Sequence, residues 1–135
     1  MITRNINKII VHCADTKTNQ SFDITDVDNW HKKRGFSMVG YHYYIKLDGT
    51  IQEGRNLEQV GAHCKGQNSD SIGICFEGGL NADGSKWDGP LSPQLDAWNS
   101  LYQYLCFMFG NLPIKAHYEY SEKSCPNFDP DDYLW

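Results

Sequence analysis

Apolar and polar positions divide the chain into short segments that predict strands alternating with helices. The segment 7–12, NKIIVH, is rich in β-branched residues and predicts a buried strand. Two more strands are expected within 40–54, joined by a two-residue turn at Asp48 and Gly49, a dipeptide that favours positive φ. The segment 71–78 predicts another buried strand, and 112–120 predicts a last short strand that ends near His117.

Two helices are expected between these strands. The first is predicted to begin at Thr25, which forms a capping box with Asp28, and it ends in a basic last turn. The second is predicted to be capped by Ser92 and to end at Gly110. Its apolar residues recur at helical spacing, as Leu95, Trp98, Leu101, Tyr102, Leu105 and Met108. This order of elements predicts an α/β fold with a central mixed β-sheet flanked by helices.

Length and composition limit the possible partners. A chain of 135 residues with 40% hydrophobic content supports one core, so we expect a single domain over residues 1–135. The sequence has neither a signal peptide nor a long apolar window, so we expect a soluble protein that is made in the cytoplasm and has no membrane partner. We also expect a monomer. The net charge is −5 and the twelve Lys and Arg residues are scattered, which argues against a nucleic-acid partner.

The five cysteines do not suggest a disulfide framework, because their number is odd and no export signal accompanies them. Cys64, Cys75 and Cys106 lie in apolar or glycine-flanked contexts that favour burial as small hydrophobic residues. Cys125 differs because it lies in the polar segment EKSCPNFD, two residues after Lys123. A cation at this spacing lowers the pKa of a thiol and faces a developing oxyanion, so Cys125 is a candidate for chemistry.

His12 and His117 stand at the ends of predicted strands, and Cys125 follows the second histidine by eight residues. Three such groups can hold a zinc ion and leave a fourth tetrahedral position for water, as catalytic zinc sites do. A lone histidine at a strand end also has an ordinary explanation as a surface or core residue. From the residues alone, a metal site and a structural role therefore both remain open.

Five motifs together resemble the zinc N-acetylmuramoyl-L-alanine amidase family, in the branch that includes the amidase-type phage lysozymes and is related to the peptidoglycan recognition proteins. The motifs are IIVHCADT, VGYHYYIKLDGTIQEGR, VGAHCKGQNSDSIGICFEGG, KAHYE and KSCPNFD. They follow one another from about residue 7 to residue 129, which is nearly the whole chain. The resemblance implies a central mixed sheet with the metal in a groove above it. It also implies cleavage, by a zinc-activated water, of the amide between N-acetylmuramic acid and L-alanine in bacterial peptidoglycan.

The same resemblance implies roles for individual residues. The positions that match the family's three zinc ligands are His12, His117 and Cys125. Tyr41 matches a tyrosine beside the attacking water, and Lys123 matches a lysine that steadies the oxyanion. His63 is expected either to line the substrate cleft or to be exposed on a loop surface.

Two positions depart from the family pattern. Some relatives have a glutamate that acts as acid and base where this chain has Cys75, so the resemblance does not identify a proton shuttle. Relatives also use either Cys or Asp as the third ligand, and CPNFD offers both Cys125 and Asp129. We favour Cys125 because a thiolate suits zinc, and we expect Asp129 to be structural or to support a ligand.

Three further residues have testable expectations. His31 is expected to be solvated on the first helix, and His42 is expected to pack on the side of its strand opposite to Tyr41. Trp87 either stacks on sugar rings or anchors its loop to the body of the protein.

Other functions remain open at this point. A non-catalytic peptidoglycan-binding module would share the fold, and a zinc peptidase that acts within the stem peptide would use the same chemical groups. Some phage members of the family also bind a polymerase, so a regulatory protein surface is a third alternative. The binding module is disfavoured because all three ligand types are present together with Tyr41 and Lys123.

Overall fold

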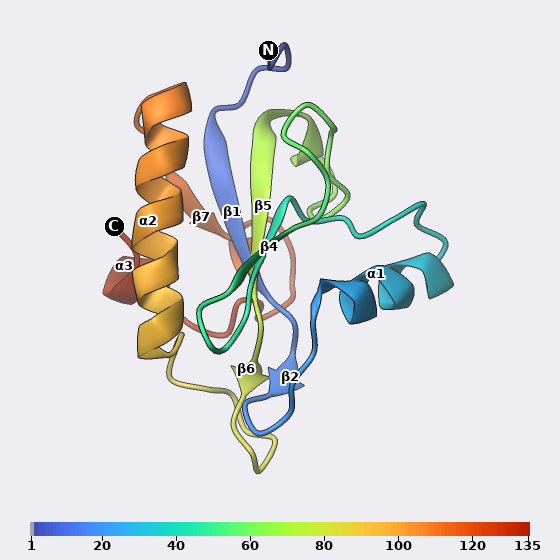
Figure 1. The fold of residues 1–135 in the computed structure, drawn as a ribbon, viewed down its shortest axis with the longest axis vertical. Coiled ribbons are helices and arrows are strands. Elements are labelled where there is room, and N and C mark those ends of the chain that lie inside the picture. The colour runs from blue at the N-terminus through green and yellow to red at the C-terminus, as the bar shows by residue number, and fades with distance from the viewer. Residues whose placement is uncertain (1) are drawn as a thin grey trace.

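A five-stranded sheet with strand order β4-β3-β5-β1-β7 forms the centre of the computed structural model, which describes residues 2–135 (Figure 1). Strand β4 pairs antiparallel with β3, and the other neighbouring pairs are parallel. The sheet is therefore mixed, as the order of elements predicts. The strand bounds are β1 (Lys8–Cys13), β3 (Tyr43–Ile45), β4 (Ile51–Glu53), β5 (Ser71–Phe76) and β7 (Ile114–Ala116).

Several short elements were not predicted from the sequence pattern. They are the parallel pair β2 (Thr16–Lys17) and β6 (Gly79–Leu80), the 3-10 helices η1 (Asn68–Asp70) and η2 (His117–Glu119), and the helix α3 (Pro130–Tyr133). Elements of two to four residues contain too few positions to establish a periodicity. None of the helices among residues 2–135 has the length and apolar character that a membrane crossing requires.

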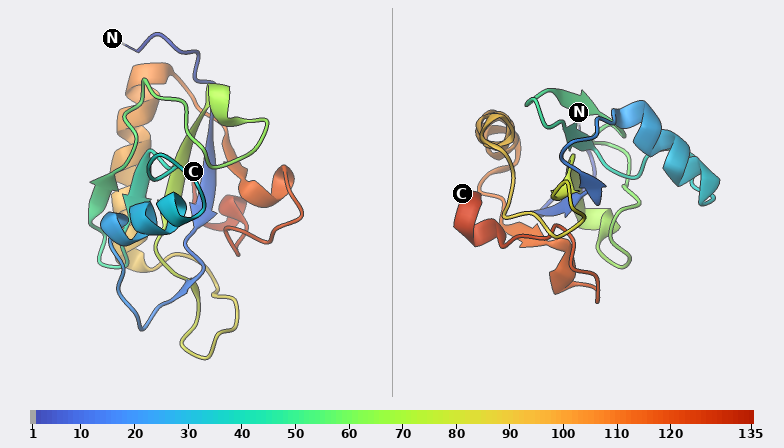
Figure 2. Two further views of the ribbon diagram at one scale, coloured as in Figure 1. Left: turned by 90° about the vertical axis from the view of Figure 1, so that its right-hand side faces the viewer. Right: turned by 90° about the horizontal axis from the view of Figure 1, so that it is seen from below.

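Helices α1 (Ile24–Lys33) and α2 (Ser92–Phe109) lie on opposite sides of the sheet (Figures 1 and 2). Trp98 and Leu105 of α2 are fully buried in the larger core, together with Ile9 and Val11 of β1. Because side chains alternate along a strand, His12 points away from α2 and toward the other side of the sheet. The sheet thus places its larger apolar core on one face, and the candidate chemistry lies on the other face beside a smaller apolar cluster of Val27, Val39, Tyr44 and Cys75.

Helix α1 begins two residues earlier than predicted. Its N-cap is Asp23, whose side chain accepts hydrogen bonds from the backbone nitrogens of Thr25 and Asp26, while Asp26 accepts one from the Asp23 nitrogen. The predicted capping box of Thr25 and Asp28 is therefore wrong. The sequence contains two overlapping capping patterns, DITD and TDVD, and the first one forms the helix end.

The N-cap of helix α2 also differs by one residue from the predicted one, Ser92. Leu91 is the N-cap residue, and its backbone nitrogen donates to Oε1 of Gln94 at 2.9 Å. Ser92 is the first helical residue, so its hydroxyl does not cap the helix. Gly110 ends the helix as predicted, with a φ of 83°.

The hairpin of β3 and β4 turns where predicted, but its loop is one residue longer. The Lys46 nitrogen donates to the Thr50 oxygen and the Gly49 nitrogen donates to the Lys46 oxygen, both at 2.8 Å. These bonds leave a loop of three residues, with Gly49 at a φ of 90°. A three-residue loop that closes on a left-handed glycine is a common hairpin connection.

Candidate metal centre and active site

Two imidazoles and one thiol, from distant parts of the chain, come together on the side of the sheet away from α2. His12 lies in β1, His117 begins η2 directly after β7, and Cys125 lies on the segment that follows. One ligand atom from each of the three lies within 4.8 Å of the others. Since zinc bonds to nitrogen and sulfur are about 2.0–2.3 Å long, this spacing is consistent with all three binding one ion.

Backbone contacts hold Cys125 close to His12. The Cys13 nitrogen donates to Sγ of Cys125 at 3.2 Å, and the Tyr118 nitrogen donates to the Cys125 oxygen at 3.0 Å. His12 is itself almost fully buried, because β1 lies between β5 and β7. The sheet therefore fixes one candidate ligand, His12, and hydrogen bonds tie the C-terminal segment to β1 beside it.

Two side chains of the cluster, His12 and Cys125, have the protonation states that metal binding requires. Burial lowers the pKa of His12, so its imidazole is neutral at physiological pH. A hydrogen bond from Cys13 lowers the pKa of the Cys125 thiol, with further contributions from His117 and His12. Neutral imidazoles and a thiolate are the forms that bind a metal ion, and this donor set suits zinc.

Two hollows meet at the cluster. The larger has a volume of about 430 Å³ and the smaller about 210 Å³. The residues that line both are His31, Arg34, Tyr41, His117 and Lys123. Because His117, a member of the cluster, belongs to both linings, a molecule in either hollow would lie beside the cluster.

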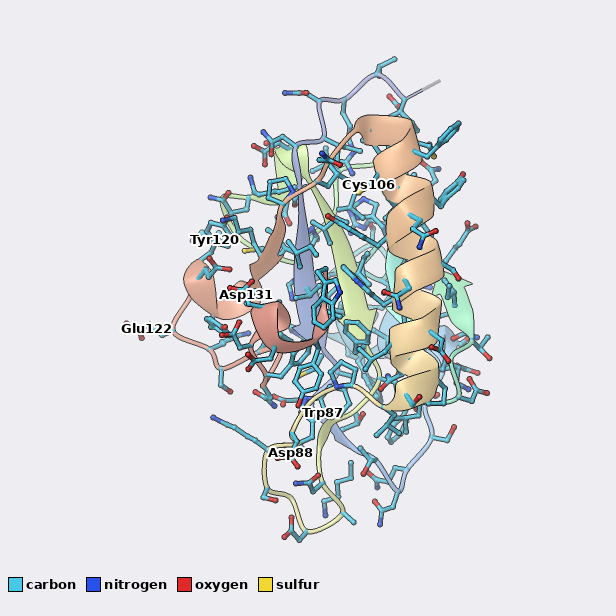
Figure 3. The ribbon with its side chains drawn as sticks, turned by 90° about the vertical axis from the view of Figure 1, so that its left-hand side faces the viewer. Trp87, Asp88, Cys106, Tyr120, Glu122 and Asp131 are labelled. Carbon is cyan, nitrogen blue, oxygen red and sulfur yellow. The ribbon has the colours of Figure 1, made fainter. Side chains whose placement is uncertain are left out.

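The structure places Tyr41 and Lys123 at this junction. The ring centroid of Tyr41 is 5.0 Å from that of His12. Burial and nearby sulfurs raise the pKa of Tyr41 well above its ordinary value, so its hydroxyl remains a hydrogen-bond donor. Lys123 is exposed to solvent on the projecting segment after η2, which also carries Tyr120 and Glu122 (Figure 3).

The lining of the larger hollow is cationic. Of the described residues that line it, Arg34, Lys65 and Lys123 carry positive charge and none is acidic. The whole chain has a net charge of −5, so this concentration of cations contrasts with the rest of the surface. Such a lining attracts ligands that carry carboxylates.

His63 lines the larger hollow but is only 8% exposed, so it is not a surface residue of its loop. Its Nδ1 lies 2.8 Å from Nε2 of His12, and its Nε2 lies 3.2 Å from Oγ of Ser71. No sequence pattern predicts the contact with His12, because His12 lies in a strand and His63 in a loop 51 residues later.

The prediction that His31 is solvated is wrong. Its ring is 6% exposed, and its Nδ1 accepts a hydrogen bond from the Gly40 nitrogen at 2.9 Å. The rings of Phe36 and Tyr41 pack against it. The segment after α1 folds back over the helix and covers His31. The few apolar residues of α1 do not predict this burial.

Other residues have structural roles. His42 is buried and accepts a hydrogen bond from the Gly73 nitrogen, which agrees with the predicted packing role. Trp87 is buried and donates through Nε1 to the Pro126 oxygen, so it anchors its loop (Figure 3). Asp129 caps α3 by accepting from the Asp131 nitrogen, and it is not part of the ligand cluster.

Known proteins resemble this chain in sequence and in fold. A family model described as N-acetylmuramoyl-L-alanine amidase matches residues 2–128. The endolysin of Escherichia phage T7 is 41% identical over 122 residues, which cover 90% of this chain and 80% of the phage protein. The solved N-acetylmuramoyl-L-alanine amidase LysC from Clostridium intestinale URNW superposes with a TM-score of 0.83 at 31% identity, covering 96% of this chain and 83% of that one. The complex of tracheal cytotoxin with the peptidoglycan recognition proteins LCa and LCx has a TM-score of 0.81 at 26% identity, covering 100% and 87%.

Proposed function

Since this chain belongs to the N-acetylmuramoyl-L-alanine amidase family and is an endolysin-like amidase of peptidoglycan, we propose that it acts through one zinc ion bound by His12, His117 and Cys125. The observation that carries the proposal is the meeting of these three ligand atoms, within 4.8 Å, at the junction of two hollows. The family activity sets aside both a purely binding module and a peptidase that acts within the stem peptide.

The three ligands define what the metal contributes. When bound, a zinc ion with three protein ligands supplies Lewis acidity and lowers the pKa of water in its fourth position to about 7. His12 and Cys125 are buried or half-buried and in the protonation states that hold the ion. His117, at the wall of both hollows, brings the ion to the place where substrate lies.

Lys123 and Tyr41 act directly on the amide. The Lys123 ammonium donates a hydrogen bond to the carbonyl oxygen, where negative charge builds as the amide is attacked. Tyr41 has an assisting role: its protonated hydroxyl orients the attacking water or the amide. Both roles are supported by the presence of these side chains in the lining of both hollows.

The substrate is peptidoglycan or a muropeptide derived from it. The stem peptide carries carboxylates, and Arg34 and Lys65 in the larger hollow are suited to pair with them. We therefore propose that the larger hollow holds the stem peptide and that the amide to be cut lies at the junction.

A cysteine replacement tests the zinc site. Cys125→Ser should lose bound zinc on dialysis and should release only background amounts of product, because a serine hydroxyl is a poor zinc ligand at neutral pH. The measurements are zinc content by atomic spectroscopy and mass spectrometry of digested peptidoglycan. The wild type should release free stem peptides that begin with L-alanine and leave the glycan strands intact.

Cys106→Ser is the matched control, because Cys106 lies on α2 on the other side of the sheet (Figure 3). It should keep both the zinc and the activity. Full zinc content and full product release in Cys125→Ser would contradict the proposed ligand set.

A further inference from the structure

We propose that His63 is a positioning residue that fixes the orientation and the tautomer of His12, an inference that rests on the proposed zinc site. The two rings meet edge to face, with their centroids 4.9 Å apart and their planes at 88°. The short contact between them joins Nε2 of His12 to Nδ1 of His63 at 2.8 Å. Both rings are buried, so water does not compete for this bond.

The direction of the hydrogen bonds follows from the single hydrogen of the Ser71 hydroxyl. That hydroxyl donates to the Gln67 oxygen at 2.7 Å, so it can only accept from Nε2 of His63, 3.2 Å away. A neutral imidazole carries one N–H, and in His63 that N–H is therefore on Nε2. Nδ1 of His63 then accepts a hydrogen bond from Nε2–H of His12.

This chain of donors leaves one nitrogen of His12 for a metal. With its hydrogen on Nε2, the imidazole of His12 has a free electron pair only on Nδ1. Ligand histidines usually donate their second N–H to a fixed acceptor, which sets the ring orientation and makes the ligand nitrogen more basic. His63 is such an acceptor for His12, whereas in most metal sites a carboxylate or a backbone carbonyl oxygen has this role.

The backbone around His63 forms a slot that holds its ring. A Cβ atom built on Gly73 of β5 would lie 2.6 Å from Cγ of His63, and one on Gly61 would lie 2.6 Å from Cδ2. The ring thus lies directly on main chain that has no side chain at either position. Oδ1 of Asn68 also accepts hydrogen bonds from the nitrogens of His63 and Cys64, both at 2.9 Å. Because both ring nitrogens are bonded within the protein, His63 offers the hollow only its carbon edge.

The wild-type protein itself provides the first test. Nitrogen-15 NMR of the metal-free, histidine-labelled chain should show both His12 and His63 as the Nε2–H tautomer, and added zinc should shift Nδ1 of His12. If His12 carries its hydrogen on Nδ1, or if zinc binds through Nε2 of His12, the inference is overturned. This measurement does not depend on any variant folding correctly.

Zinc affinity of variants provides the second test, measured by competition with a chelator of known affinity. His63→Leu should raise the zinc Kd about 10- to 100-fold, the usual effect of removing a partner of a ligand histidine. His63→Asn should lose less, since its side-chain oxygen can accept the hydrogen of His12. The control Gln94→Leu removes a buried polar side chain of α2 that donates to the Ile45 and Glu77 oxygens and has no hydrogen bond to His63 or the ligand cluster. It should leave the Kd within about threefold of the wild type.

Equal zinc affinity of His63→Leu and the wild type, or an equal loss in Gln94→Leu, would overturn the role of His63. A wild-type chain that takes up no zinc would instead overturn the proposed metal site. The two failures are therefore distinguishable in the same experiment.

Discussion

Cys75 occupies a position where its chemistry limits the mechanism. It lies directly across from His12 in the register of β1 and β5, and it is fully buried. Burial raises the pKa of its thiol well above the ordinary value, so the thiol stays protonated at neutral pH. A protonated thiol does not accept a proton as a carboxylate would. In the proposed mechanism, Cys75 therefore takes up no proton. The protein groups that act on the amide are the hydrogen-bond donors Tyr41 and Lys123.

Lys123→Ala tests the donor assigned to the carbonyl oxygen. The variant should keep its zinc but lose about 10²- to 10³-fold in kcat, as expected when one oxyanion donor is removed. Zinc analysis checks that the metal is retained, and turnover of a defined muropeptide measures the loss in kcat. Lys65→Ala is the matched control, because Lys65 lines only the larger hollow and should affect KM more than kcat. Wild-type turnover in Lys123→Ala would refute the assignment.

Residue identity and motif order were enough to nominate His12, His117 and Cys125, which do meet in space. They were not enough for His63 or His31. The contact of His63 with His12 depends on a loop that folds over Gly73, and the burial of His31 depends on a segment that returns over α1. Neither of these loop paths produces a periodic pattern of apolar residues in the sequence, so only the structure shows these contacts.

At the scale of elements, two buried histidines fasten the loops that surround the site. Nδ1 of His31 in α1 accepts from the Gly40 nitrogen, and Nδ1 of His42 accepts from the Gly73 nitrogen of β5. Nε2 of His42 also contacts the Gln59 oxygen at 2.8 Å. Both imidazoles must be neutral to accept at Nδ1, which makes these attachments sensitive to acid.

Stability should therefore fall in mildly acidic solution. Burial lowers the pKa of His31 and of His42 to about 4, whereas an unfolded chain has a histidine pKa of about 6.5. Between these values the unfolded state binds more protons, so stability is lost as the pH falls from about 6.5 to about 4. At about 1.4 kcal/mol per pKa unit, each histidine contributes at most roughly 3.5 kcal/mol to this loss.

Urea unfolding at pH 7 and pH 4.5, with a chelator present at both, measures the effect free of metal loss. His42→Leu should be less stable at pH 7 but should show a smaller difference between the two pH values. A wild-type midpoint that is the same at both would rule out buried neutral histidines as the cause.

Elements with a strong pattern were the most predictable. The β-branched runs of β1 and β5 and the apolar spacing of α2 mark these elements correctly, because each buries a continuous face. Boundaries were less predictable. At the start of α1, Asp23 with Asp26 and Thr25 with Asp28 are both possible capping boxes, and the local sequence does not distinguish them. The short β2 and β6 pair depends on the path of two loops, which local sequence does not encode.

At the scale of the whole molecule, the proposed ion joins the centre of the sheet to the segment that follows β7. His12 belongs to the most enclosed strand, whereas the stretch 118–124 between the other two ligands is largely exposed. Removing zinc with a chelator should therefore lower the Tm, and adding zinc back should restore it. A ligand present at a hundredfold excess over its Kd contributes about 2.7 kcal/mol of stability. Calorimetry measures this change, and Cys125→Ser should show no response to either treatment.

An identical Tm before and after zinc removal would show that the C-terminal segment does not depend on the ion. Limited proteolysis distinguishes the two cases, because a released segment should be cut first within 118–124.

The cationic lining of the larger hollow also affects how the molecule meets an insoluble polymer. The rest of the chain carries an excess of acidic groups, so its net charge disfavours contact with a polymer that bears carboxylates, whereas the cationic lining of the larger hollow favours such contact. At physiological salt this effect operates over only about 8 Å, the distance at which charges are screened. The fraction of encounters that place the polymer in the larger hollow should therefore fall as ionic strength rises. Weak binding of the wall by the rest of the surface lets the protein dissociate and bind at another place.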